Sequence, residues 1–240
     1  MYQEKLDLLL KKYDVPVSAR MNGTASVEID GTVCPILSHR AERRFAELKK
    51  MLHDGTTAGM SAVRCGHVAP CTVPLYGLIR RELDIARFIT GQEIVGVTAF
   101  VRAENGEDRA ATIIAEMSGG AVCSMEIADT LPAGEGHIDK HEVITSRGLV
   151  CDRVVDSQIP ARSVYLYGES GDEAYTDVDY ELYGLDQDEA AAVRCAFALA
   201  KDEALRAEAL SNAETLDRLM AAVEQSAESG ERVSVGNDEV

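Results

Sequence analysis

Residues 94–127, IVGVTAFVRAENGEDRAATIIAEMSGGAVCSMEI, decide the predicted fold. The stretch contains three runs rich in β-branched and small apolar residues, separated by the turn sequences Asn105-Gly106 and Ser118-Gly119-Gly120. Such runs joined by tight turns predict neighbouring antiparallel strands. Further runs of the same kind follow at residues 142–145, 163–167 and 177–183. We therefore expect an antiparallel meander and not a series of strand-helix-strand units.

Helices are predicted before and after this meander. Gly91 follows a helical pattern and is a typical carboxy-terminal stop. Ser211 and Glu214 form a capping-box pattern, which predicts the start of the last helix. The predicted helices cover residues 3–13, 40–53, 74–90, 186–210 and 213–227.

Together these elements predict an α+β fold, with a mostly antiparallel open sheet and helices packed on one of its faces. We expect residues 39–236 to form this domain. Residues 1–38 are predicted to be a short helix-and-strand remnant or extension, and residues 237–240 a frayed tail.

The charge balance restricts the classes of partner. The 240 residues include 24 basic and 41 acidic side chains, which gives a formal net charge of −17 at pH 7. A surface this negative repels phosphate backbones and anionic lipids. We therefore expect neither nucleic-acid nor membrane binding.

Cysteine usage indicates a reducing compartment. The six cysteines include no Cys-x-x-Cys pair, and no export signal begins the sequence, so we expect reduced thiols and a cytoplasmic location.

Two patterns contain metal-type ligands, Cys65-x-His67-x₃-Cys71 and His137-x₃-His141. The first is not a zinc-ribbon spacing, and the second would need a helix that the neighbouring glycines disfavour. We expect no metal at either pattern.

Three segments, in this order, carry a resemblance to a known family. They are Arg44-Phe45 with Leu48-Lys49 and Asp54-Gly55, then residues 78–91 (LIRRELDIARFITG), and then residues 226–233 (SAESGERV). From about residue 40 to 236 the chain resembles the carboxy-terminal domain of the Gfo/Idh/MocA oxidoreductases, which include glucose–fructose oxidoreductase and inositol dehydrogenase. The resemblance implies the fold described above, a sugar or polyol as ligand, and pairing through the open face of the sheet.

The segment 78–91 resembles the active-site helix of that family, whose pattern is Asp-x-x-x-His-x-x-Asp. When Asp84 is taken as the last Asp, Arg81 stands at the proton-transferring His and Gly77 at the first Asp. Arginine stays protonated and cannot act as a general base, and glycine has no side chain. We therefore expect no catalytic residue in this chain. We expect Tyr76, Arg81 and Asp84 to form a substrate-binding site.

The chain also lacks the motif that binds a dinucleotide. Its one Gly-x-Gly, Gly134-Glu135-Gly136, has no third glycine and lies in a loop sequence. We expect no cofactor in this chain, with NAD(P) present only if a partner subunit supplies its site.

Three functions remain open at this stage. The chain is predicted to be a Gfo/Idh/MocA-like protein that is non-catalytic alone and binds a sugar or polyol-type ligand or a partner subunit. Alternatively, it is the substrate subunit of a split NAD(P)-dependent sugar or polyol dehydrogenase, or an inactive truncated dehydrogenase.

The sheet sequence predicts assembly. Along residues 94–101, Ile94, Thr98 and Phe100 are expected on one face, and Val95 and Val97 on the other. Apolar residues on both faces require cover on both. We expect a homodimer or hetero-oligomer through the open face, buried across residues 94–101 and 112–117.

Overall fold

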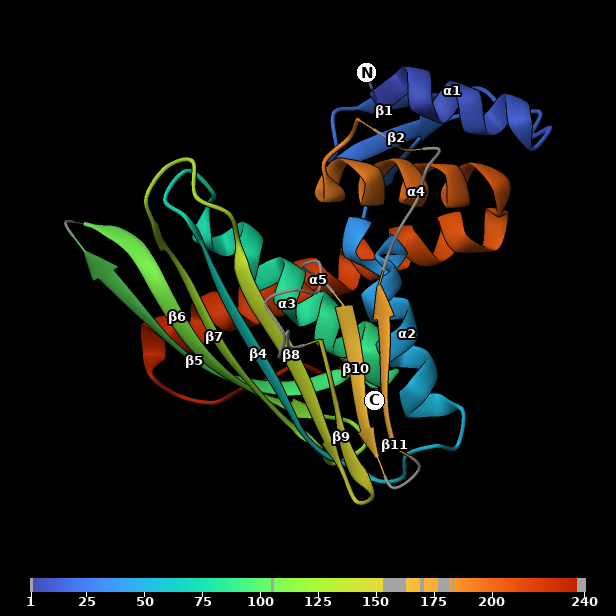
Figure 1. Cartoon of the computed structure of the whole chain (residues 1–240). Coiled ribbons are helices and arrows are strands. Elements are labelled where there is room, and N and C mark those ends of the chain that lie inside the picture. The colour runs from blue at the N-terminus through green and yellow to red at the C-terminus, as the bar shows by residue number, and fades with distance from the viewer. Residues whose placement is uncertain are drawn as a thin grey trace. The chain divides into compact units, whose positions relative to one another are not determined.

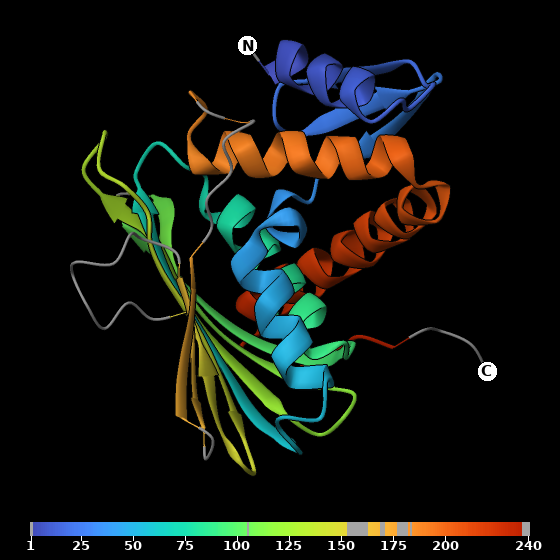
Figure 2. The ribbon, with the colours of Figure 1, turned by 45° about the vertical axis from the view of Figure 1, so that its right-hand side comes forward.

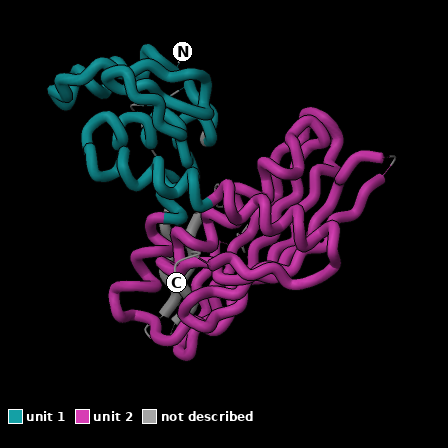
Figure 3. The backbone as a smooth tube through the Cα atoms, turned by 180° about the vertical axis from the view of Figure 1, so that it is seen from behind, with its two compact units in different colours: residues 1–45, 178–215 teal, residues 46–177, 216–240 magenta. Residues whose placement is uncertain are grey.

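The computed structural model describes residues 2–104, 106–152, 163–168, 171–176, 182 and 184–236. They form two compact units, which Figure 3 draws in different colours. The first unit combines residues 1–45 with 178–215, and the second combines residues 46–177 with 216–240. Each unit is therefore built from two segments that are distant in the sequence.

The second unit contains a nine-stranded sheet with the strand order β11-β10-β9-β8-β4-β7-β6-β5-β12 (Figure 1). Among these strands, every neighbouring pair is antiparallel except β4 and β7. This confirms the predicted open, mostly antiparallel sheet. The strands are β4 Met60–Pro70, β5 Ile94–Glu104, β6 Glu107–Met117, β7 Val122–Leu131, β8 Ile138–Thr145, β9 Gly148–Cys151, β10 Ser163–Gly168, β11 Gly171–Thr176 and β12 Val233–Ser234.

The position of β4 differs from the predicted meander. β4 lies between β7 and β8, with Val63 beside Cys123 in a parallel pairing and Cys65 opposite His141 in an antiparallel one. Turn signals report only the pairing of strands that follow each other closely, so they do not reveal this insertion. As a result, the side chains of β4 lie in the middle of the sheet.

Helices cover one face of the large sheet (Figure 2). They are α3 (Leu75–Thr90), the later part of α5 (Glu203–Ser229) and the later part of α2 (Arg43–His53). Gly91 ends α3 as predicted, in the left-handed conformation with φ of 63° and with its N–H bonded to the Arg87 carbonyl at 2.9 Å. The end of α5 is fixed to β5 because the Ala99 N–H donates to the Ser226 hydroxyl at 2.9 Å.

A β-bulge near the start of β5 changes which face its residues occupy. The pairing with β6 shifts between Ile94 and Gly96. Beyond the shift, Val97 and Ala99 are buried, whereas Phe100 is 58% exposed. The sequence analysis placed Ile94 on the same face as Phe100, but Ile94 is buried because the extra residue reverses the alternation.

The first unit has a small three-stranded antiparallel sheet and helices from both of its segments. Its core joins Leu6 and Val27 with Ala192 and Val193. The predicted boundary after residue 38 differs from this division, because a contact between distant segments leaves no local sequence signal. The elements are α1 Tyr2–Lys12, β1 Ala19–Asn22, β2 Ser26–Ile29, β3 Thr32–Pro35, the 3₁₀ helix η1 Ser38–Ala41 and α4 Gln187–Lys201.

The break between the last two helices lies at Asp202, not at Ser211 as predicted. The Asp202 carboxylate accepts a hydrogen bond from the Ala204 N–H at 2.9 Å, which satisfies one donor of the first turn of α5. Ser211 lies inside α5, where its side chain and that of Glu214 are exposed. A Ser-x-x-Glu pattern thus occurs within a helix without beginning one. The helix predicted to start at residue 186 does start there, as α4, with a capping box formed by Asp186 and Glu189.

Among the described helices, none has an apolar stretch long enough to cross a membrane. Apart from residue 182, the predicted strand at 177–183 lies outside the described residues, as does the tail at 237–240.

Candidate functional site

A group of ionisable side chains lies between α3 and the large sheet, around the predicted site residue Arg81. We call it the histidine–carboxylate cluster. Its members come from β4, α3, β8 and the single residues just before β8 and just after β9, and all belong to the second unit. They are His67, Arg81, Glu82, His137, Asp139, His141 and Asp152.

Glu82 is the centre of the cluster and has no exposed surface. Its Oε1 accepts hydrogen bonds from Arg81 at 2.7 Å and from His67 Nδ1 at 2.8 Å. Its Oε2 accepts one from His141 Nε2 at 2.8 Å. Burial acts to raise the pKa of Glu82, but His141, His67 and Arg81 together hold it well below its usual value. Glu82 is therefore a buried carboxylate.

His141 lies between two carboxylates. Its Nε2 faces Glu82, and its Nδ1 lies 2.6 Å from Asp152 Oδ2. Burial opposes the charged ring, but Asp152 and Glu82 hold the pKa of His141 well above its usual value. Because carboxylates accept hydrogen bonds, both ring nitrogens carry protons and His141 is an imidazolium.

Strand alternation explains why these side chains meet. Cys65 and His67 are two residues apart on β4 and point to the helix-covered face, as His141 does on β8. In the register of the two strands, Cys65 pairs with His141 and His67 with Asp139. Glu82 in the second turn of α3 then lies above both histidines.

Two members of the cluster, Glu82 and His141, form with the neighbouring Cys65 the one group in the described part of the chain that has the spacing of a metal site. One ligand atom each from Cys65, Glu82 and His141 lies within 4.8 Å of the others. A hydrogen bond with Cys123 and burial raise the pKa of Cys65 well above its usual value, so it is a thiol. Metal ligation needs a thiolate and an imidazole lone pair, whereas His141 uses both nitrogens as donors. The arrangement therefore favours an ionic network over a metal site.

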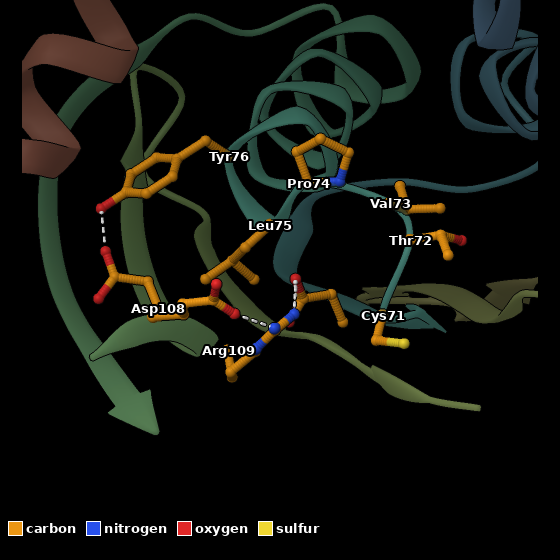
Figure 4. A pocket seen from close by; sticks show the side chains of 10 residues that line it. Cys71, Thr72, Val73, Pro74, Leu75, Tyr76, Asp108 and Arg109 are labelled. Atoms are coloured by element: carbon orange, nitrogen blue, oxygen red, sulfur yellow. Dashed lines mark hydrogen bonds and ion pairs between the residues drawn. The ribbon is translucent and has the colours of Figure 1, made fainter. Parts of the chain in front are cut away.

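A separate open pocket of about 470 Å³ lies at the start of α3 (Figure 4). It is lined by residues 71–76 and 107–109 together with Asp129. The Tyr76 hydroxyl donates to Asp108 at 2.8 Å, and burial and this carboxylate raise the pKa of Tyr76 to about 12. Tyr76 is therefore a neutral donor at physiological pH.

Asp129 is the least exposed polar group of the pocket, at 4%. One of its oxygens accepts a hydrogen bond from Arg109 at 3.2 Å. The other is buried and has no hydrogen-bond partner among the described residues. A ligand that brings a hydrogen-bond donor to such a buried acceptor gains free energy of binding.

The structure places the three predicted site residues in different surroundings. Tyr76 lines the pocket, and Arg81 belongs to the histidine–carboxylate cluster. Asp84 has no exposed surface and pairs with Arg87 at 3.1 Å, and its contact with a ligand stays a prediction. Spacing along the helix put Asp84 near Arg81 but did not reveal that Arg87 would hold it inside.

Sequence reasoning missed Glu82 and the histidine network. The first metal-type pattern is divided in the structure, because Cys71 lines the pocket whereas His67 joins the cluster. Both histidines of the second pattern, His137 and His141, join the cluster. The available signal was one histidine in each of two strands, His67 in β4 and His141 in β8. Cross-strand pairing of β4 with β8 was needed to interpret it.

The fold of the chain is that of part of several solved oxidoreductases. An oxidoreductase domain protein from Kribbella flavida matches with a TM-score of 0.65 and 18% identity, over 84% of this chain and 65% of that one. An inositol dehydrogenase homologue from Azotobacter vinelandii, solved with NADH and myo-inositol, matches with a TM-score of 0.64 and 14% identity, over 83% and 63%. A levoglucosan dehydrogenase solved with NADH and levoglucosan matches with a TM-score of 0.66 and 14% identity, over 83% and 65%.

These similarities confirm the fold implied by the resemblance to the carboxy-terminal domain of the Gfo/Idh/MocA oxidoreductases. The chain spans 63–65% of the length of these three structures. No protein-family model and no curated protein sequence matches it.

The ionic network predicts a pH-dependent loss of stability in His141→Gln. The variant leaves Glu82 and Asp152 buried without their cation, and we expect a loss of about 3–5 kcal/mol near neutral pH. In the parent protein, the pKa of Glu82 is lower in the folded state than in the unfolded state. Its contribution to the free energy of unfolding is therefore fully present above the pKa of the unfolded state and is lost as the pH falls through the pKa of the folded state. The pKa of His141 is higher when folded, so its contribution is lost as the pH rises through that value. The difference between variant and parent should therefore be largest between about pH 4.5 and 6.5, where both contributions are fully present, and should shrink in more acidic and in more basic solution.

Urea unfolding between about pH 4 and 8 measures this difference. Asp217→Asn is the control, because it removes an exposed carboxylate paired with Arg80 and should change stability by less than about 1 kcal/mol. A His141→Gln deficit that stays constant with pH contradicts the assignment of charges.

Proposed function

We propose that this chain binds a small polyhydroxy compound in the pocket at the start of α3, and that it is not a dehydrogenase by itself. The observation that carries the proposal is Asp129, which lines a pocket of about 470 Å³ and has one buried oxygen without a hydrogen-bond partner among the described residues. The fold likeness to proteins solved with myo-inositol and levoglucosan supports the same class of ligand.

The pocket offers both partners that a sugar hydroxyl needs. Asp129 supplies an acceptor for the hydroxyl proton. The first turn of α3 begins at Leu75, and Pro74 before it provides no side-chain cap, so backbone N–H donors are available there. Glu107, Asp108 and Asp129 make the lining acidic, which disfavours phosphorylated or carboxylated ligands.

No residue of the pocket suits a dinucleotide, and we propose that the chain has no NAD(P) site of its own. A second candidate is the substrate-binding chain of a two-chain dehydrogenase, favoured by the likeness to longer proteins solved with NADH. We place the protein in the cytoplasm, a proposal supported by its six free cysteines.

The pocket assignment predicts a ligand whose binding depends on Asp129. We expect a polyol such as myo-inositol or levoglucosan to raise the melting temperature of the parent protein. Asp129→Asn should weaken binding about tenfold, because it removes a charge-assisted hydrogen bond. Glu47→Gln is the matched control, since Glu47 also has a buried oxygen without a hydrogen-bond partner but lies outside the pocket.

Calorimetric titration measures both affinities, and the same titration with NADH should show no binding. If a polyol binds Asp129→Asn as tightly as it binds Glu47→Gln, the binding site lies elsewhere. Micromolar affinity for NADH contradicts the proposal that the chain has no NAD(P) site of its own.

We also propose a homodimer or hetero-oligomer formed through the open face of the large sheet. Exposed apolar side chains on this face support it, including Phe100, Ile114 and Val122. Phe100 stands opposite Thr112, and Ile114 lies between Thr98 and Ser124, so the apolar groups alternate with small polar ones. A face of this composition is more typical of a protein–protein interface than of a surface exposed to solvent.

Phe100→Glu is predicted to turn a dimer into a monomer without unfolding it, because Phe100 points away from the helices. Leu8→Glu, at an exposed position of α1 in the other unit, should leave the assembly unchanged. Light scattering gives the mass of each variant at micromolar concentration. A monomeric parent with no co-purifying chain rejects the proposal.

A further inference from the structure

We propose that the ligand of the pocket at the start of α3 carries an amino group, so that the pocket takes a cationic amino sugar or aminocyclitol in preference to a neutral polyol. This inference rests on the proposed function and narrows the class of ligand. The observation that carries it is the charge of the lining, which holds more carboxylates than cations.

One cation in the lining is shared by two carboxylates. The guanidinium of Arg109 bonds Asp129 at 3.2 Å and also bonds Glu107. Figure 4 shows Arg109 in this bridging position, on the same side of the pocket as Asp108. The described lining holds three carboxylates, Glu107, Asp108 and Asp129, against this single guanidinium. Two negative charges are therefore not compensated within the pocket.

Asp108 has no cationic partner among the described residues. It accepts a hydrogen bond from the hydroxyl of Tyr76 at 2.8 Å, and the two side chains point toward each other in Figure 4. Burial raises the pKa of Tyr76, and Asp108 and then Glu224 and Glu228 of α5 raise it further, to about 12. Tyr76 is therefore neutral and compensates no charge, while carboxylates of two elements act on its hydroxyl.

Asp129 adds an acceptor that is not filled. It lines the pocket at 4% exposure, and one of its oxygens has no hydrogen-bond partner among the described residues. An ammonium group brings three donors and a positive charge, whereas a hydroxyl brings one donor and no charge. Hydrogen bonds in which the partners are charged are about twice as strong as neutral ones. The carboxylates of this pocket therefore favour an amine over a hydroxyl.

The other side of the pocket distinguishes an amino sugar from a plain cation. The first turn of α3 offers backbone N–H donors, which suit the oxygens of ligand hydroxyls. Val73 and Leu75 also line the pocket and suit the C–H groups of a sugar or cyclitol ring. The helix end carries about half a positive charge, which is smaller than the two uncompensated negative charges. A compound with one ammonium and several hydroxyls uses both sides of the pocket, whereas a metal ion or a polyamine leaves the N–H donors without acceptors.

Matched ligands give the test, by calorimetric titration of the parent protein at about pH 6, where an amine of this kind is protonated. D-glucosamine is compared with D-glucose and N-acetyl-D-glucosamine, and an amino-inositol is compared with myo-inositol. We expect the amine to bind about tenfold tighter than its neutral partner, because its hydrogen bonds to carboxylates are charge-assisted. N-acetyl-D-glucosamine should bind no tighter than D-glucose, since acetylation removes the charge.

The outcomes separate this inference from the proposed function. Equal affinities for the amine and its neutral partner overturn the inference and leave a polyol pocket standing. If none of these compounds binds, the inference and the proposed function both fail.

A double variant, Glu107→Gln with Asp108→Asn, tests whether the carboxylates cause the preference. Both side chains are exposed, so we expect the variant to fold. The advantage of the amine should fall to about twofold or less, while the affinity for the neutral partner changes by less than about twofold. Glu203→Gln with Glu214→Gln is the control, because it removes two exposed carboxylates of α5 that do not line the pocket. A preference that survives in the first variant, or falls equally in the control, contradicts the inference.

Cys71 reports where the amine binds. It is exposed and lines the pocket, whereas the other five cysteines are buried. Iodoacetamide should therefore alkylate Cys71 first, and mass spectrometry measures the rate. We expect a saturating amine to slow this alkylation about fivefold or more, because the bound ligand covers the thiol. An unchanged rate at saturation places the amine outside this pocket and overturns the inference.

Discussion

Glu82 carries its negative charge between α3 and the large sheet, at a position with no exposed surface. A carboxylate there is stable only if donors and positive charges surround it, since an uncompensated buried ion costs several kcal/mol. Arg81 from the same helix and His67 and His141 from two strands meet that requirement. The bonds also fix the distance and rotation of α3 relative to β4 and β8, so both the pocket at the start of α3 and the exposed His137 depend on them.

The same constraint explains how this chain differs from the pattern it resembles. In the family that the chain resembles, the position of Arg81 holds a proton-transferring histidine. Here the guanidinium of Arg81 donates a hydrogen bond to Glu82 and holds it ionised. The pocket lined by Tyr76 and Asp129 is separate from this cluster. The ionic network and the pocket therefore use different residues of one unit.

Much of the fold could be predicted because its signals are local. Gly91 ends α3 in the left-handed conformation that only glycine adopts readily, and the turn glycines separate β5, β6 and β7. The long-range features could not be predicted. The insertion of β4 beside β8, the bulge at Ile94 and the packing of α4 on the amino-terminal elements depend on contacts between distant residues. The cluster depends on the same contacts, since His67 and His141 meet only after β4 and β8 pair.

The central claim is that Glu82 and His141 act as one ionic unit, and a double-mutant cycle measures it most directly. The free energies of unfolding of Glu82→Gln, His141→Gln and the double variant are compared with that of the parent near pH 7. Removing one partner leaves the other as an uncompensated buried charge, whereas the double variant removes both of these charges. Asp152 loses His141 in the single His141→Gln variant and in the double variant alike, so its effect cancels from the coupling energy. The account predicts a coupling energy of about 2–3 kcal/mol between the two residues. Single-variant losses that add to within about 0.5 kcal/mol would contradict it.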